Sequence, residues 1–303
     1  MKKYCFILVI FGVLAFFLIC PAEAGQAAAD GLLIWYSRVL PVLLPFCILL
    51  SWVIKSGLLE SLEDAKHQKT LPWIAAISGL LFGFPTGSRM AAQMYEKNLL
   101  TRQQAQIICN CCNQMSPAFV GGYVICSMLQ CPQRLFATYL IVYLPSIVWC
   151  ALALAGTKVT GAVLKSHKKP ASGFDINMQI IDAGIMNGCE TLMKLCGYIV
   201  LFSIAATALA QWKQIPPILH VLLTGYLEVT NGIAKLTVCP MGEEKKYVLA
   251  ICFLCFGGIS GIAQTGSMIK DTDLSMSQYV VAKILLSVIS SILAIGYLFV
   301  GSF

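Results

Sequence analysis

The chain has 303 residues, of which 58% are hydrophobic and only 12% are charged, and its mean hydropathy is +0.79. This composition excludes an ordinary soluble domain. The net charge of +7 is spread over short segments between apolar runs, without interleaved aromatic residues, which is typical of membrane topology and not of a nucleic-acid interface. The apolar runs are continuous and recur along the chain, so they predict an all-α, polytopic helical membrane protein and not a β-barrel.

The N-terminus has the pattern of a signal-anchor segment over residues 1–24. Lys2 and Lys3 precede an apolar run over 5–20, and residues 22–24 have the small-x-small form of a signal-peptidase site. The pattern is compatible with cleavage, but we favour a retained first helix because polytopic proteins usually keep their first span. Residues 25–303 are expected to form a single membrane domain.

Further crossing helices are expected over residues 39–54, 135–156, 195–210 and 280–300. Two shorter apolar runs, 71–84 and 218–227, are too short for a comfortable crossing and are expected to be re-entrant. Two longer runs, 106–129 and 247–269, are interrupted by Ser-Pro and by Gly and Ser residues, which predicts broken helices. Residues 174–191 have one apolar and one polar face, so this segment is expected to lie along the membrane interface.

The same order of elements occurs in both halves of the chain and predicts an internal repeat. Repeat one covers about residues 39–157, a basic linker covers 158–173, and repeat two covers about 174–303. A shift of 145 residues superposes Gly87 on Gly232.

The distribution of basic residues predicts that the two repeats are inverted. If the N-terminus is cytoplasmic and both short runs are re-entrant, 15 of the 21 Lys and Arg residues, Lys283 among them, lie on the cytoplasmic side. The two re-entrant segments then enter from opposite faces. Inverted repeats with paired broken helices are typical of secondary transporters, whose substrate site lies between the repeats.

The first break has the sequence GFPTGSR at residues 83–89, and its polar groups predict a site for an anion. Thr86, Gly87 and Ser88 offer backbone amides at a helix N-terminus together with two hydroxyls, and Arg89 adds a fixed positive charge. The alternative is a tight turn whose Arg89 reaches to the lipid phosphates. Both interpretations are compatible with the sequence.

The second break contains Glu228, the only acidic residue inside an apolar run. A carboxylate within a membrane is a candidate proton carrier or cation ligand, and Glu228 is the predicted coupling residue. The alternative is a structural partner for Lys235 or Arg89. The predicted substrate-binding residues of this half of the chain are Thr230, Asn231, Gly232, Lys235 and Gln264, which join Asn113 and Ser116 of the first half. Each amide or hydroxyl could separately be a tie between helices, whereas together they suit a polar organic solute.

No catalytic motif is present, since the chain lacks a P-loop, H-E-x-x-H and G-x-S-x-G. The 14 cysteines lie mostly inside apolar runs, and none of the three histidines is near them, so we expect packing and not a metal or redox site. The chain is therefore not expected to be an enzyme or to bind a cofactor.

Five stretches together resemble the YlbJ-type sporulation integral membrane proteins, which belong to the wider group with the nucleoside-recognition or Gate domain. They are VLPVLLPF at 39–46, GFPTGSRMAAQM at 83–94, LTRQQAQIICNCCNQMSPAFVGGYV at 100–124, GYLEVTNGI at 225–233 and FGGISGIAQ at 256–264. The resemblance implies a multi-pass inner-membrane protein of endospore-forming bacteria, in the membrane that surrounds the forespore. It also implies a role in moving dipicolinate, a small aromatic dianion. This chain is shorter than typical members, and its third stretch reads NQMSPAF where relatives often have a plainer pattern.

The leading hypothesis is a secondary transporter or permease for a small organic anion, most favourably dipicolinate during spore formation. Its expected partners are this anion, the lipid bilayer and other sporulation membrane proteins, and no nucleic acid. Two alternatives stay open: a non-transporting scaffold or gate subunit of a sporulation complex, and a nucleoside transporter.

Overall fold

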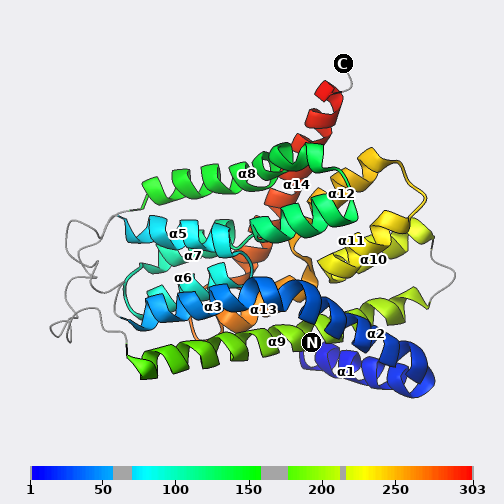
Figure 1. Ribbon diagram of the computed structural model, residues 1–303, viewed down its shortest axis with the longest axis horizontal. Helices are drawn as coiled ribbons and strands as arrows, with labels where there is room; N and C mark the ends of the chain where they lie inside the picture. The colour runs from blue at the N-terminus through cyan, green and yellow to red at the C-terminus, as the bar shows by residue number, and fades with distance from the viewer. Residues whose placement is uncertain (1, 57–69, 158–176, 212–215, 302–303) are drawn as a thin grey trace.

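The computed structural model describes residues 2–56, 70–157, 177–211 and 216–301, and these residues form helices and no strand (Figure 1). The first elements are α1 (Lys2–Ile19), α2 (Pro21–Ile34), η1 (Trp35–Val39) and α3 (Leu40–Lys55). The next elements are α5 (Leu71–Phe82), α6 (Thr86–Glu96), α7 (Arg102–Cys112), η2 (Phe119–Met128), η3 (Pro132–Arg134) and α8 (Leu135–Ala155). The last are α9 (Met178–Ala210), α10 (Pro217–Leu227), α11 (Val229–Val238), α12 (Glu243–Phe256), α13 (Gly258–Met268) and α14 (Met276–Gly301).

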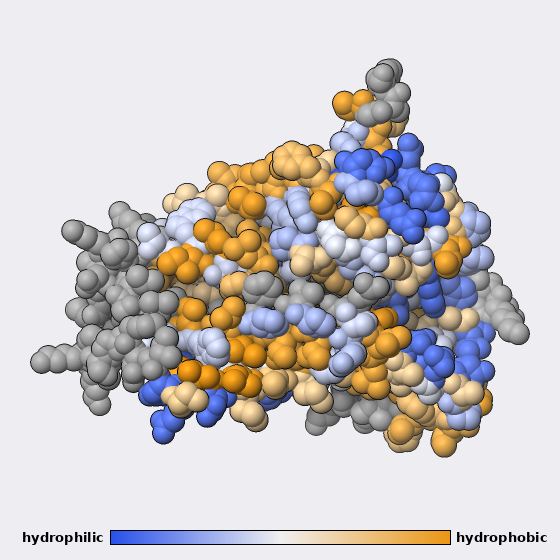
Figure 2. Space-filling view, in the orientation of Figure 1, coloured by the Kyte–Doolittle hydropathy of each residue, from blue (hydrophilic) through white to orange (hydrophobic). Residues whose placement is uncertain are grey.

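Four stretches of the described chain are helical, long and apolar enough to cross a membrane: Pro132–Ala155, Met178–Ala210, Glu243–Met268 and Met276–Val300. A fifth exists if Phe11–Ile19 and Pro21–Ser37, which meet at an angle of 115°, are one bent span. In Figure 2, hydrophobic side chains cover much of the surface between hydrophilic groups that gather toward the ends of the molecule. The prediction of an all-α, multi-pass membrane protein is confirmed.

Both short apolar runs form the first arm of a helical hairpin. α5 is followed by a turn and α6, and α10 is followed by a turn and α11. Each hairpin packs through a pair of glycines, because a Cβ atom on Gly87 would lie 3.1 Å from the Cα of Gly79, and one on Gly232 would lie 2.1 Å from the Cα of Gly225. Glycine therefore brings the two backbones of each hairpin into direct contact.

The two hairpins lie at opposite ends of the molecule in Figure 1, with α5 and α6 on one side and α10 and α11 on the other. Their tips reach the middle of the fold, where Gly83 lies against Ser116 and Leu227 lies against Gly258. Each tip thus abuts the break of a broken helix. The internal repeat and its inversion across a bilayer both stay predictions.

The two interrupted helices are broken for different local reasons. α7 ends at Cys112, and an irregular stretch leads to Pro117, where Ser116 begins the next helical segment by accepting a hydrogen bond from the Phe119 amide with its Oγ. α12 ends at Gly257, whose φ of 83° lies in the left-handed region that favours glycine. Both predicted breaks are confirmed.

One predicted division of the chain is wrong. Residues 174–191 and 195–210 were expected to form an interfacial helix and a separate span, but Met178–Ala210 is a single helix of 33 residues. Asn177 begins it by accepting a hydrogen bond from the Ile180 amide with its side chain. Its first half packs against α3, where Gly184 lies against Trp52, Gly188 lies against Ile48, and the Trp52 indole donates to the Ile181 carbonyl oxygen at 3.1 Å.

Candidate functional site

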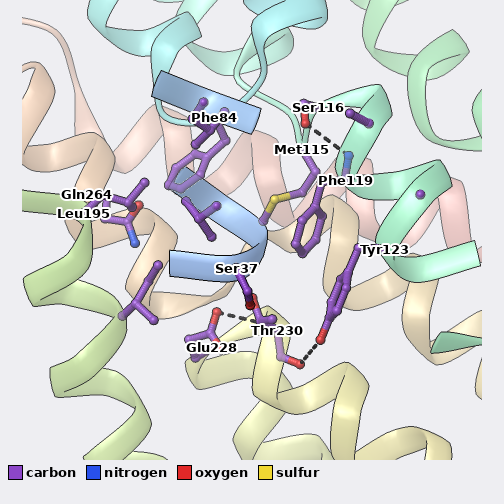
Figure 3. Close-up of a pocket in the computed structure, with 15 residues that line it drawn as sticks. Ser37, Phe84, Met115, Ser116, Phe119, Tyr123, Leu195, Glu228, Thr230 and Gln264 are labelled. Atoms are coloured by element: carbon purple, nitrogen blue, oxygen red, sulfur yellow. Dashed lines mark hydrogen bonds between the residues drawn. The ribbon is translucent and has the colours of Figure 1, made fainter. Parts of the chain in front are cut away.

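The tips of both hairpins, the break of the first interrupted helix and α13, which follows the break of the second, line one pocket of about 370 Å³ (Figure 3). Phe84 comes from the first hairpin tip, and Glu228 and Thr230 come from the second. Met115 and Ser116 belong to the first break. The described residues that line it are Ser37, Val39, Leu43, Phe84, Met115, Ser116, Ala118, Phe119, Gly122, Tyr123, Leu195, Ile199, Glu228, Thr230 and Gln264.

The predicted anion-binding amides of the first hairpin tip are bonded within the protein. The amides of Thr86 and Gly87 donate to the Gly83 carbonyl oxygen at 2.9 and 3.2 Å, and the Ser88 amide donates to the Asn113 Oδ1 at 3.2 Å. All three residues are buried, and none of them lines the pocket. In this conformation the tip presents the ring of Phe84 to the pocket, and its polar groups hold the hairpin against the first break.

Arg89 joins the first hairpin to α9 and does not line the pocket. Its Nη1 donates to the Oγ1 of Thr191 and, at 3.4 Å, to the carbonyl oxygen of Asn187. The guanidinium therefore fixes α6 against the first half of α9. The structure does not bring this predicted anion-binding side chain together with Glu228 or Gln264.

Glu228 is 6% exposed and has two roles in the structure, because it lines the pocket and begins α11. Its Oε1 accepts the Thr230 amide at 3.0 Å and its Oε2 accepts the Asn231 amide at 2.7 Å. A carboxylate at this position neutralises the positive end of the helix. The ammonium of Lys235 is directed elsewhere and donates to the Thr224 Oγ1 at 3.4 Å.

The second hairpin tip is also tied to neighbouring helices. Asn231 donates from its Nδ2 to the Ser203 Oγ of α9 at 2.6 Å, and the hydroxyl of Tyr123 lies 3.5 Å from the Thr230 carbonyl oxygen (Figure 3). Gly232 lies in the glycine contact between the two arms and not in the pocket. The tip is therefore held from two sides, by α9 and by η2.

Gln264 lines the pocket and has a buried polar atom that no described residue binds. Its Nε2 donates to the Ser260 Oγ at 2.9 Å, while its Oε1 is buried without a hydrogen-bond partner among the described residues. An unpaired polar atom in such a place costs free energy unless a bound guest or water satisfies it. Of the predicted substrate-binding residues, Gln264, Ser116 and Thr230 line the pocket together with the predicted coupling residue Glu228.

Asn113 connects the first break to three other elements. Besides accepting the Ser88 amide, its side chain donates from Nδ2 to the Thr265 Oγ1 at 3.0 Å and to the Tyr279 hydroxyl at 3.1 Å. Asn113 is fully buried, so these bonds link α6, α13 and α14 out of contact with solvent. The role that the structure gives to Asn113 is therefore a tie beside the pocket.

The sequence analysis missed Lys283, which it placed among the cytoplasmic charges. Lys283 is 1% exposed, and its Nζ donates to the Gln114 Oε1 at 2.8 Å and to the Asn113 carbonyl oxygen at 3.3 Å. The assignment to the cytoplasmic surface is wrong, because the side chain points into the protein at the first break. A lone lysine within the apolar run 280–300 was the available signal.

A comparison with curated proteins finds the "Sporulation integral membrane protein YlbJ" of Bacillus subtilis (strain 168). It is 22% identical over 314 aligned positions, which cover 90% of this chain and 77% of that protein. This similarity supports a YlbJ-type family assignment. The predicted resemblance to the YlbJ-type proteins is thereby confirmed, as is a multi-pass membrane location, while membership of the wider Gate-domain group stays a prediction. No protein-family model and no solved structure matches the chain.

Proposed function

We propose that this YlbJ-type chain is a secondary transporter or permease that moves a small organic solute through the central pocket during spore formation. One observation carries the proposal: both hairpin tips, the first helix break and Gln264 of α13, which follows the second break, line the same cavity, so both halves of the chain contribute to it. Interrupted backbone inside a membrane is tolerated where it is packed in protein or lines a cavity, and paired interruptions are typical of transporter binding sites.

The size of the pocket favours a small guest. Its volume of about 370 Å³ lies near the lower end of the range of roughly 300–1,000 Å³ that is common for ligand sites. Phe84, Phe119 and Tyr123 give it aromatic walls, and Ser116, Thr230 and Gln264 give it polar side chains. These features suit a flat organic molecule with a few polar atoms, and dipicolinate, which the family resemblance implies, is our first candidate.

The charge of the guest is the property that the pocket constrains most. Among the described side chains of the lining, Glu228 is the one that carries a charge, and its two oxygens accept hydrogen bonds from the amides of Thr230 and Asn231. Arg89 and Lys235 do not line the pocket, so in this conformation they would act on an anion without contacting it. We propose that Glu228 couples transport to a proton, and intact uptake by a Glu228→Gln variant would end that role.

The direct test is uptake of dipicolinate, other small dicarboxylates and nucleosides by proteoliposomes containing the full chain. Gly122 lines the pocket, and nothing lies within 4 Å of the position that a Cβ atom would take there. A Gly122→Leu variant should therefore fill the pocket without a clash and abolish uptake while the melting temperature stays unchanged.

Gly197 of α9 is the matched control, because it also has free space around a Cβ atom but does not line the pocket. Uptake by Gly197→Leu should equal that of the unmodified chain. Equal uptake by Gly122→Leu would remove the pocket from the transport route. Transport of none of these solutes by the unmodified chain would favour a scaffold or gate subunit, and competition by nucleosides alone would favour the nucleoside alternative.

A further inference from the structure

Lys283 lies where the interruptions of the two broken helices meet. Its Nζ donates to the carbonyl oxygen of Asn113, the residue that directly follows α7, and to the side chain of Gln114. Its Nζ also lies 3.9 Å from the position that a Cβ atom on Gly257 would take, at the residue that ends α12. One ammonium group therefore contacts the C-terminal end of α7 and lies beside that of α12.

The C-terminal ends of helices carry unpaired carbonyl groups and a partial negative charge. In transporters with interrupted helices, such ends and the freed carbonyls coordinate the coupling cation. Here the Lys283 ammonium takes a place of this kind. Lys283 belongs to α14, which is long and apolar enough to cross a membrane.

No carboxylate balances the charge of Lys283 within the part of the chain that the structure describes. The ion pairs found there join other residues, and Gln114 and Asn113, the two direct partners of Lys283, are uncharged and fully buried. A buried charge without a partner of opposite sign is expensive, so a simple tie between helices would need only a neutral side chain. Ser290 of the same helix is such a tie, since its hydroxyl donates to the Ile141 carbonyl oxygen at 2.9 Å.

The junction that Lys283 contacts continues directly into the pocket wall. Met115 and Ser116, which follow its partner Gln114, both line the pocket. The Asn113 side chain bonds to Thr265, the residue after the pocket residue Gln264. A change in the charge at the junction would therefore act on residues that are only one or two positions away from the pocket lining.

We propose that the Lys283 ammonium is a built-in cation, which occupies the place that a bound monovalent ion takes in other transporters with interrupted helices. The junction of α7 and α12 is then charge-balanced at all times, and the fold and the solute movement require no Na⁺ there. The part of this proposal that concerns solute movement rests on the proposed transport function, whereas the part that concerns the fold does not.

The experiment compares the purified full chain with Lys283→Ala and Lys283→Met in NaCl, KCl and choline chloride at equal ionic strength, with and without propylammonium. The melting temperature is measured first, because it does not depend on transport. The unmodified chain should melt alike in all three salts. Lys283→Ala leaves a cavity with a partial negative charge, so it should melt lower in choline and recover with Na⁺ or propylammonium. Lys283→Met fills the same cavity without a charge and should not recover.

Ser290→Ala is the matched control, because it loses a buried hydrogen bond of the same helix away from the junction. It should melt lower without any response to the choice of cation. Stabilisation of the unmodified chain by Na⁺ alone would overturn the proposal, and this comparison remains decisive even if Lys283→Ala does not fold. An identical response of Lys283→Ala and Lys283→Met to the cations would overturn it as well.

Uptake measured in the same salts separates this proposal from the transport function. Equal uptake in Na⁺, K⁺ and choline by the unmodified chain supports both. Cation-dependent recovery of melting in Lys283→Ala, together with no uptake of any tested solute by the unmodified chain, would leave the built-in cation standing and remove the transport function.

Discussion

The close contact between the arms of the second hairpin makes Gly232→Ala the sharpest test of the fold. A Cβ atom at this position would lie 2.1 Å from the Cα of Gly225 and 2.7 Å from its nitrogen. Carbon atoms in contact are normally about 3.5–4.0 Å apart, so α10 and α11 would have to separate by roughly 1.5 Å. The atoms in the way belong to the backbone, and no rotation of a side chain can relieve the clash.

The expected cost follows from two opposing terms. Overpacking of this kind destabilises by about 1–3 kcal/mol, and a contact against backbone belongs at the upper end. The higher helix propensity of alanine offsets at most about 1 kcal/mol of this destabilisation. The free energy of unfolding is therefore expected to fall by about 2 kcal/mol. The separation would also displace Glu228 and Thr230 at the tip, so uptake should fall together with stability.

The assay is thermal unfolding in detergent followed by a dye that fluoresces on reaction with thiols. Cys109, Cys111, Cys112 and Cys255 are buried, so they react only when the core opens. Gly197→Ala is the control, because nothing lies within 4 Å of its Cβ position and its melting temperature should stay equal or rise. If Gly232→Ala melted together with this control, the direct contact between the hairpin arms would be refuted.

Two further substitutions test the ties around the pocket. Glu228→Ala leaves the amides of Thr230 and Asn231 without their acceptors and should lower the stability by about 1–2 kcal/mol, whereas Glu228→Gln keeps one acceptor and should lose less; equal melting temperatures for the two variants would contradict this. Arg89→Met removes the hydrogen bonds to α9 and should cost about 1.5–3 kcal/mol, with partial recovery in Arg89→Lys. An unchanged melting temperature in Arg89→Met would show that this tie adds nothing to the fold.

The features that the sequence predicted correctly depend on local composition. Length and apolarity identified the spans over 135–156 and 280–300, because crossing a bilayer imposes a minimum length on a helix. The breaks at Ser116 and Gly257 were recognised because proline and glycine interrupt a helix through their own backbone preferences, independently of tertiary contacts. The same signals indicated the two short runs that form hairpins.

The features that the sequence did not reveal depend on long-range contacts. The wall formed by Ser37, Leu43 and Leu195 brings two distant segments to one cavity, and nothing local distinguishes these residues from others that face lipid. Arg89 was predicted to bind an anionic substrate, because a cation near a helix N-terminus is typical of an anion-binding site. In the structure its guanidinium donates instead to a hydroxyl and a carbonyl group of α9. The single helix over 178–210 was predicted as two helices because its first half is amphipathic. The packing of α3 against that half depends on residues that are distant in the sequence.

The sequence by itself determined an all-helical membrane chain, its resemblance to the YlbJ-type proteins, two interruptions in each half and the presence of Glu228 within an apolar run. These properties follow from hydropathy and backbone preference, which act within a few residues. The tertiary structure alone decided that Glu228 faces the pocket while Arg89 and Lys235 do not, and that Lys283 lies at the junction of two broken helices. The position of each of these side chains depends on which group forms a hydrogen bond with it, and the partners are supplied by residues far apart in the chain.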